Sequence, residues 1–175
     1  MPKLVKNNRH SILAKLEKYI LSTLKEESIS PALVLECLEY LYSDRPWFPA
    51  ASNSQLRRKT QMYRRVFSSL MLLCIKHSIP TSAGFVYVVT HPKHTGVVKI
   101  GSTQDCEDRL GSYQTYCPDR SFSMAWRTIS FNRLKDEKEL ISRFATPKLG
   151  EWVYVNYSNS EDLSIQLNEF KVNYG

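Results

Sequence analysis

The arginines of one predicted helix have a type and spacing suited to binding phosphate. Two arginine pairs stand one heptad apart, and at about 100° per residue they fall within an arc of roughly 120°: Arg57 and Arg58, then Arg64 and Arg65. Arginines at this spacing repel one another, and a guanidinium forms paired hydrogen bonds with phosphate oxygens. We interpret this face as a surface for a nucleic-acid backbone, without base-specific recognition. A solvated helix face is the alternative.

Histidine and cysteine side chains raise a second possibility, a zinc site. His91 and His94 precede Cys106 and Cys117, but the gaps match no common zinc module, and both histidines fall in a turn with Pro and Gly. The pattern does not favour zinc. We interpret the two histidines as surface residues and the four cysteines as reduced, mostly buried thiols of an intracellular protein.

The positive charge of the chain is confined to its first half. The net charge is +7 over 175 residues, and residues 1–80 hold 13 Lys or Arg against 6 Asp or Glu, whereas residues 81–175 hold 11 of each. This asymmetry suggests a polyanion-binding segment joined to a charge-balanced module. No apolar run approaches the ~18 residues of a membrane span, and no signal-peptide pattern is present. We expect a soluble protein of the cytoplasm or nucleus, without a membrane partner; the oligomeric state is open.

The first half is predicted to be helical. Apolar residues recur at three- and four-residue steps over 11–24. A second helix is expected from Ser30-Pro31, because Ser caps helices well and Pro is tolerated at the first position. Prolines and small polar residues over 44–54 predict a loop, and a third helix is expected over 54–76, with Leu56 on its apolar side. We assign residues 1–80 to a basic helical domain that is a candidate for binding nucleic acid.

Beyond residue 80 the periodicity changes to two, which predicts a mixed α+β domain over residues 81–175. A hairpin, a third strand and a short fourth strand are expected at 85–89, 97–101, 122–131 and 151–155. Helices are expected after Asp105, after Asn132 and over 162–170, because Asp and Asn are good caps. The inner face of the helix after Asn132 is expected to carry Leu134 and Leu140. Trp152 is interpreted as core packing.

Several motifs of this second half follow one another in a recognisable order: Gly84-Phe85-Val86-Tyr87, Val98-Lys99-Ile100-Gly101-Ser102, Arg109, Glu137 seven residues before Phe144, and Gly150-Glu151-Trp152. Together they resemble the GIY-YIG nuclease superfamily. They are most similar to a divergent branch, common in phages and large DNA viruses, with KIG in place of YIG. The resemblance covers about residues 84–155, and it implies a small three-stranded antiparallel sheet flanked by helices.

The resemblance also implies hydrolysis of phosphodiesters with one divalent metal, Mg²⁺ or Mn²⁺. Tyr87 matches the candidate general base, and its phenol would need Lys99 and Arg109 to lower its pKa from about 10. Arg109 matches the arginine that binds phosphate oxygens, and Glu137 matches the metal-binding glutamate. Tyr113, one helical turn after Arg109, matches a residue that positions the phosphate or the water. Lys99 replaces the tyrosine of the second motif, and its ammonium could hold phosphate.

Each of these residues also has a structural interpretation. Tyr87 and Tyr113 could be aromatic residues at the edge of the core, and Lys99 could protect a sheet edge. Glu137 could be a solvated helix charge, and Arg109 could pair with the acidic residue one turn earlier. Their joint occurrence in this order favours the nuclease interpretation.

We therefore expect a metal-dependent endonuclease acting on DNA; the sequence leaves open whether RNA is also accepted. The four arginines of the helical domain would hold the substrate while the second domain cuts it. A non-cleaving nucleic-acid-binding protein with a degenerate nuclease module is the alternative. A helical adaptor whose basic face contacts an acidic protein is a third possibility.

Overall fold

The computed structural model describes residues 6–42, 53–144, 148–149, 152–157 and 159–171. It divides into two compact units, residues 1–82 and 83–175. Residues 44–52 of the predicted loop lie outside the described residues, and residues 53–54 begin a helix instead. Among the described helices, none combines the length and the hydropathy needed to cross a bilayer.

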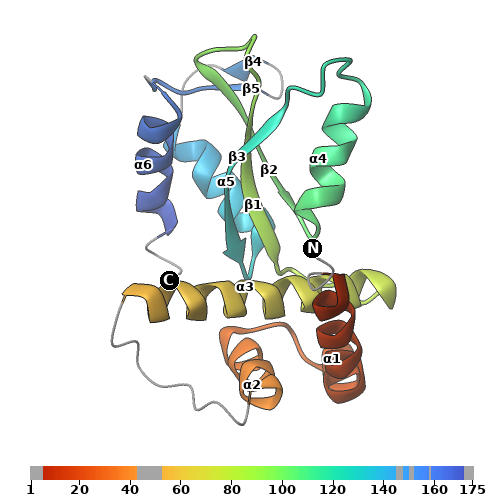
Figure 1. Cartoon of the computed structure of the whole chain (residues 1–175). Coiled ribbons are helices and arrows are strands. Elements are labelled where there is room, and N and C mark those ends of the chain that lie inside the picture. Colours follow the sequence, from red (N-terminus) through yellow and green to blue (C-terminus); the bar gives the residue numbers. More distant parts are fainter. Residues whose placement is uncertain (1–5, 43–52, 145–147, 150–151, 158, 172–175) are drawn as a thin grey trace, which may run out of the picture. The chain divides into compact units, whose positions relative to one another are not determined.

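The first unit contains three described helices, α1 (Lys6–Glu26), α2 (Pro31–Leu41) and α3 (Asn53–Lys76) (Figure 1). The predicted cap of α2 is confirmed, because the Ser30 hydroxyl accepts a hydrogen bond from the Leu33 amide at 3.2 Å. The predicted apolar stripes form the core of the unit: Leu16, Ile20, Leu24, Leu33, Val34, Leu38, Phe67 and Leu70. Leu56 departs from the prediction and is 55% exposed, because it lies in the first turn of α3, before the helix reaches this core.

The second unit is built on one antiparallel sheet (Figure 1). Its elements are β1 (Gly84–Thr90), β2 (Val97–Thr103), α4 (Cys106–Thr115), β3 (Ser123–Ser130), α5 (Arg133–Arg143), β4 (Lys148–Leu149), β5 (Trp152–Tyr154) and α6 (Ser160–Lys171). The strand order is β3-β1-β2-β5-β4. The predicted α+β class is confirmed, but the sheet is wider than three strands because β5 pairs with the outer edge of β2 and β4 pairs with β5.

Helices α5 and α6 cover one face of this sheet. Val86 and Val88 of β1 and Ile100 of β2 pack there with apolar side chains of both helices, among them Leu140, Leu163, Leu167 and Phe170. Leu134 was expected on the inner face of α5 but is 59% exposed. Asp136 is buried in the first turn instead, where its carboxylate accepts a hydrogen bond from Ser130 Oγ at 2.5 Å. This buried polar contact links the first turn of α5 to the end of β3.

Candidate active site

Tyr87 is the centre of the candidate site. Side chains alternate along a strand, so Val86 and Val88 enter the core beneath α5 and α6 while Tyr87 faces the opposite side of the sheet. Gly101 is its cross-strand partner on β2. A Cβ atom at residue 101 would lie 2.5 Å from the Tyr87 hydroxyl oxygen. The absence of a side chain at residue 101 therefore allows the Tyr87 ring to lie across β2, where it is almost fully buried.

Helix α4 positions the arginine and the second tyrosine. The Asp105 carboxylate caps the helix by accepting hydrogen bonds from the amides of Glu107 and Asp108, at 3.0 and 3.2 Å. Arg109 and Tyr113 lie four residues apart and so share one side of α4. Arg109 Nε donates to the Tyr87 hydroxyl at 3.0 Å, and the hydroxyls of Tyr87 and Tyr113 are 3.0 Å apart. Arg109 thus bonds to Tyr87, while the acidic residue one turn earlier serves as the helix cap.

Lys99 joins this group through cation–π contacts. Its Nζ lies 5.3 Å from the ring centroid of Tyr113 and 5.4 Å from that of Trp152. Trp152 pairs with Lys99 in the register of β2 and β5, so it stands on the face opposite the main core. The interpretation of Trp152 as core packing was wrong. Its ring is half-buried and lies beside Phe122 and His94, because strand alternation directs Val153 rather than Trp152 into the core.

The pKa of Tyr87 is raised above its ordinary value of 10.0. Burial is the largest cause and the hydrogen bond with Tyr113 is the second, while the hydrogen bond and charge of Arg109 lower the pKa only in part. The expectation that neighbouring cations would lower this pKa was therefore wrong. Burial removes water from around the phenolate, and this disfavours the charged form by more than the hydrogen bond and charge of Arg109 favour it. At neutral pH Tyr87 is an uncharged phenol that can donate a hydrogen bond.

Glu137 meets the sheet from the other face. It lies on α5, and its carboxylate accepts a short hydrogen bond from Ser102 Oγ. Ser102 is the cross-strand partner of Val86 and so faces the α5 side of β2. The structure therefore brings Tyr87, Lys99, Arg109 and Tyr113 together on one face of the sheet. Glu137 lies on the opposite face, where it is bonded to Ser102, the residue that follows Gly101. Ser102 is the last residue of the motif at 98–102, but no role in the site was predicted for it from the sequence.

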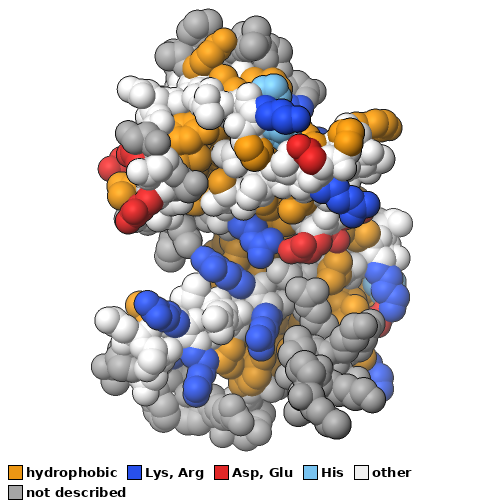
Figure 2. Space-filling model, turned by 45° about the horizontal axis from the view of Figure 1, so that its top comes forward, with side chains coloured by type: hydrophobic (Ala, Val, Ile, Leu, Met, Phe, Trp, Pro, Cys, Tyr) orange, Lys and Arg blue, Asp and Glu red, His pale blue; other side chains and the backbone are white. Residues whose placement is uncertain are grey.

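The four arginines of the basic face all lie on α3. Each is exposed, while Val66, Phe67, Leu70, Met71, Leu73 and Cys74 of the same helix are buried. The predicted division of α3 into an apolar and a basic side is thus present: Arg57, Arg58, Arg64 and Arg65 lie on the side away from the core. Figure 2 shows more Lys and Arg than Asp and Glu side chains among the described residues of the face it draws.

The cysteine and histidine residues differ in part from expectation. All four cysteines are free and buried, as predicted. His94 is exposed as expected, but His91 is only 8% exposed and lies beside Cys117 and Asp119. The interpretation of His91 as a surface residue was wrong, because the loop after α4 folds over the end of β1. The sequence placed both His91 and Cys117 among the candidate zinc ligands, but their separation of 26 residues matches no common zinc module. Asp119 was not among those candidates.

Comparisons with curated proteins and with solved structures found no significant match. A family model matches the second unit, and residues 1–83 lie outside the match. The matched segment spans β1 to the first turns of α6 and so includes Tyr87, Lys99, Arg109, Tyr113 and Glu137. Residues 84–164 are thus similar to the T5orf172 domain, a phage-associated domain from the context of GIY-YIG and HNH-like endonucleases.

Proposed function

We propose that this protein is a metal-dependent endonuclease of the GIY-YIG type that hydrolyses phosphodiester bonds in DNA. The observation that carries the proposal is the linked group of Arg109, Tyr87 and Tyr113 with Lys99 beside it. The similarity of residues 84–164 to the T5orf172 domain supports a role with nucleic acid.

Two cations of this group are suited to a phosphate in the course of hydrolysis. Arg109 is exposed, and its side chain is oriented by the hydrogen bond to Tyr87. The Lys99 ammonium lies against the ring of Tyr113. An oriented guanidinium and a nearby ammonium offset the negative charge that develops on the phosphorus oxygens, which is the largest contribution a site of this kind makes.

Tyr87 and Tyr113 have different roles in this proposal. Because Tyr87 is buried and its pKa is raised, it acts as a positioning residue that orients Arg109 and Tyr113 rather than as the general base. Tyr113 is only half-buried, so its hydroxyl can contact a bound phosphate or the attacking water. This assignment differs from what the resemblance implied for Tyr87.

Glu137 is the proposed ligand of Mg²⁺ or Mn²⁺. Its carboxylate, with the adjacent Ser102 hydroxyl, is an all-oxygen donor set, and such a set fits these cations, which commonly use one or two carboxylates together with substrate phosphate. A bound cation would offset charge on the phosphate and make a water more acidic. The hydrogen bond from Ser102 fixes the orientation of the carboxylate.

The proposed role of the first unit is to hold the substrate. Exposed arginines on one helix face bind a phosphate backbone of any sequence, whereas the second unit is neutral overall. This division would separate affinity from chemistry, because the cutting unit would not need a basic surface of its own.

Nicking of a supercoiled plasmid in Mg²⁺ or Mn²⁺ tests the proposal. We expect Arg109→Ala and Glu137→Gln to lower the rate by about 10²–10³-fold, as the loss of a charge-stabilising group does. Arg120→Gln and Glu139→Gln are matched controls, because they remove the same charges from this unit outside the proposed site, at exposed Arg120 and at half-buried Glu139, and should leave the rate unchanged. Persistent cutting by Glu137→Gln would show that the metal ligand is misassigned.

A non-cleaving nucleic-acid-binding protein is the second candidate function. Two observations favour it, the raised pKa of Tyr87 and the position of Glu137 on the opposite face of β2 from Arg109. Salt-sensitive binding without cutting in any divalent metal would establish this alternative. Absence of binding at low salt would instead support the adaptor with a basic face.

A further inference from the structure

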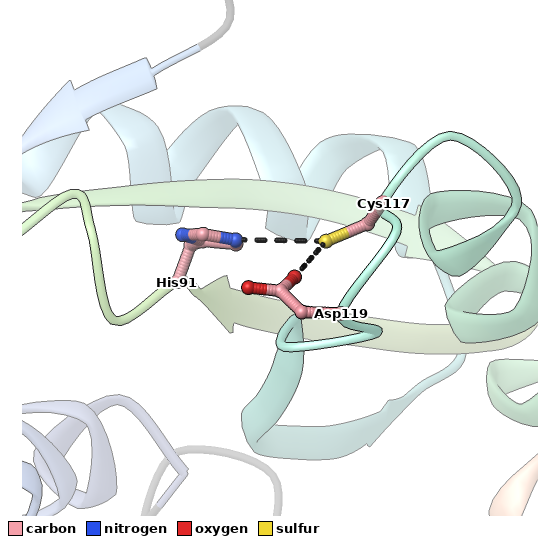
Figure 3. Close-up of side chains that lie close together, drawn as sticks. All are labelled: His91, Cys117 and Asp119. Atoms are coloured by element: carbon pink, nitrogen blue, oxygen red, sulfur yellow. Dashed lines mark hydrogen bonds between the residues drawn. The ribbon is translucent and has the colours of Figure 1, made fainter.

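We propose that His91, Cys117 and Asp119 form a binding site for one zinc-like divalent cation, separate from the proposed Mg²⁺ ligand Glu137. Figure 3 shows the three side chains pointing toward one another from the end of β1 and from the loop after α4. Their ligand atoms all lie within 4.8 Å of one another. His91 and Cys117 are buried, while Asp119 reaches the surface.

The distances from Cys117 Sγ to the other two ligand atoms are close to those around a tetrahedral zinc ion. Bonds of about 2.0–2.3 Å at tetrahedral angles place neighbouring ligand atoms about 3.3–3.8 Å apart. His91 Nε2 and Cys117 Sγ are already 3.6 Å apart. Cys117 Sγ and Asp119 Oδ1 are 2.9 Å apart, so the exposed aspartate must withdraw by less than about 1 Å to reach that range.

The three atoms also have the right chemistry. An imidazole nitrogen, a thiolate and a carboxylate oxygen are the ligand types that zinc accepts, whereas Mg²⁺ selects oxygen alone. Ser121 Oγ lies 2.7 Å from both His91 Nε2 and Asp119 Oδ1 and 3.6 Å from Cys117 Sγ, so it lies next to all three ligand atoms. It must move aside when the cation enters, and a water then fills the fourth position.

Without a cation these groups are joined by hydrogen bonds. The Lys93 amide donates to His91 Nδ1 at 3.1 Å, so His91 Nε2 carries the ring proton and donates to Ser121. Coordination through Nε2 moves that proton to Nδ1, breaks the contact with the Lys93 amide and releases the Cys117 thiol proton to solvent. Lys93 lies in an exposed turn, which would have to shift for this exchange, and its Nζ lies 3.6 Å from the other oxygen of Asp119.

A bound cation would link the end of β1 to the loop that follows α4. Phe122 packs on His91 with a centroid distance of 4.7 Å and on Tyr113 at 5.6 Å. The cation would therefore stabilise the loop that supports Tyr113, without contacting Tyr113 itself. Its predicted effects are on stability and on metal content, which can be measured independently of any nuclease activity.

The test is to strip the full chain of metal with a chelator and then to titrate it with Zn²⁺ and, separately, with Co²⁺. We expect one equivalent to bind at this site, a thiolate-to-cobalt absorption band, and a rise in the Tm with Zn²⁺ that is lost in His91→Gln and in Asp119→Asn. Loss of a residue that only hydrogen-bonds to a metal ligand lowers metal affinity by about 10–100-fold. We expect a larger loss of affinity from replacing a ligand itself, in Cys117→Ser, His91→Gln and Asp119→Asn.

Two matched variants serve as controls. Cys106→Ser removes another buried thiol and His94→Gln removes the neighbouring histidine, and both should keep the cobalt band. If Cys117→Ser does not fold, His91→Gln and Asp119→Asn decide the question, with circular dichroism to verify folding. A folded wild-type chain that shows no thiolate band, or a band unchanged in Asp119→Asn and His91→Gln, would overturn the proposal and leave the group as a hydrogen-bonded link between β1 and the loop.

Discussion

Gly101 lies directly across from Tyr87 in the sheet, and the Tyr87 ring occupies the space that a side chain at residue 101 would fill. An added Cβ would stand 2.5 Å from the hydroxyl oxygen and 2.7 Å from Cζ of Tyr87. The same hydroxyl accepts a hydrogen bond from Arg109. One glycine on β2 therefore determines whether the tyrosine and the arginine can meet.

Gly101→Ala should displace the Tyr87 ring and destabilise the protein by about 1–3 kcal/mol, the usual cost of overpacking a core. Gly111→Ala is the matched control, because nothing lies within 4 Å of a Cβ at that helical position. This change should stabilise α4 by about 0.5–1 kcal/mol. Urea unfolding of both variants measures the difference. Equal stability of the two would contradict the proposed contact.

The raised pKa of Tyr87 predicts a loss of stability in alkali. Because the folded state holds the phenolic proton more tightly, Tyr87 contributes to the free energy of unfolding. This contribution is complete below the unfolded pKa of about 10 and is lost as the pH rises through the higher folded pKa. Urea unfolding between pH 8 and pH 11 should show a steeper decline for the wild type than for Tyr87→Phe. Tyr116→Phe is the control, since Tyr116 is 91% exposed. Parallel declines for wild type and Tyr87→Phe would contradict the prediction.

The cap of α4 should affect both stability and the position of Arg109. Asp105→Ala removes the acceptor for two amides at the start of the helix and should cost about 0.5–2 kcal/mol. Asp105→Asn retains a side-chain oxygen and should recover most of this loss. Unfolding by urea measures the free energy, and hydrogen exchange of the α4 amides locates it. An effect spread over the first unit rather than α4 would be inconsistent with a local cap.

Binding of a DNA duplex should depend on the exposed arginines of α3. Removing one arginine that binds a phosphate lowers the slope of log K against log salt by about 0.9, so Arg64→Gln/Arg65→Gln should reduce it by up to about 2. Lys18→Gln/Lys25→Gln on α1 removes the same charge from exposed positions and is the control. Fluorescence anisotropy at several salt concentrations gives both slopes. If both double variants changed the slope equally, net charge rather than the α3 face would govern binding.

Local structure was predictable where neighbouring residues determine it. Ser30, Asp105 and Asn132 cap α2, α4 and α5 as expected, because a side-chain oxygen satisfies amides only two or three residues away. The β1–β2 hairpin follows from two β-branched runs joined by a short turn. Leu134 and Leu56 departed from prediction because a helical pattern does not show where the partner surface ends.

The amino-acid sequence by itself determined the α+β class, the order of the site motifs and the basic side of α3, since these depend on residue type and periodic spacing. The tertiary structure alone decided that Tyr87 is buried with a raised pKa, that Glu137 and Arg109 approach β2 from opposite faces, and that His91 lies beside Cys117 and Asp119. Desolvation and the convergence of distant side chains depend on how the chain packs. Neither property can therefore be predicted from neighbouring residues along the chain.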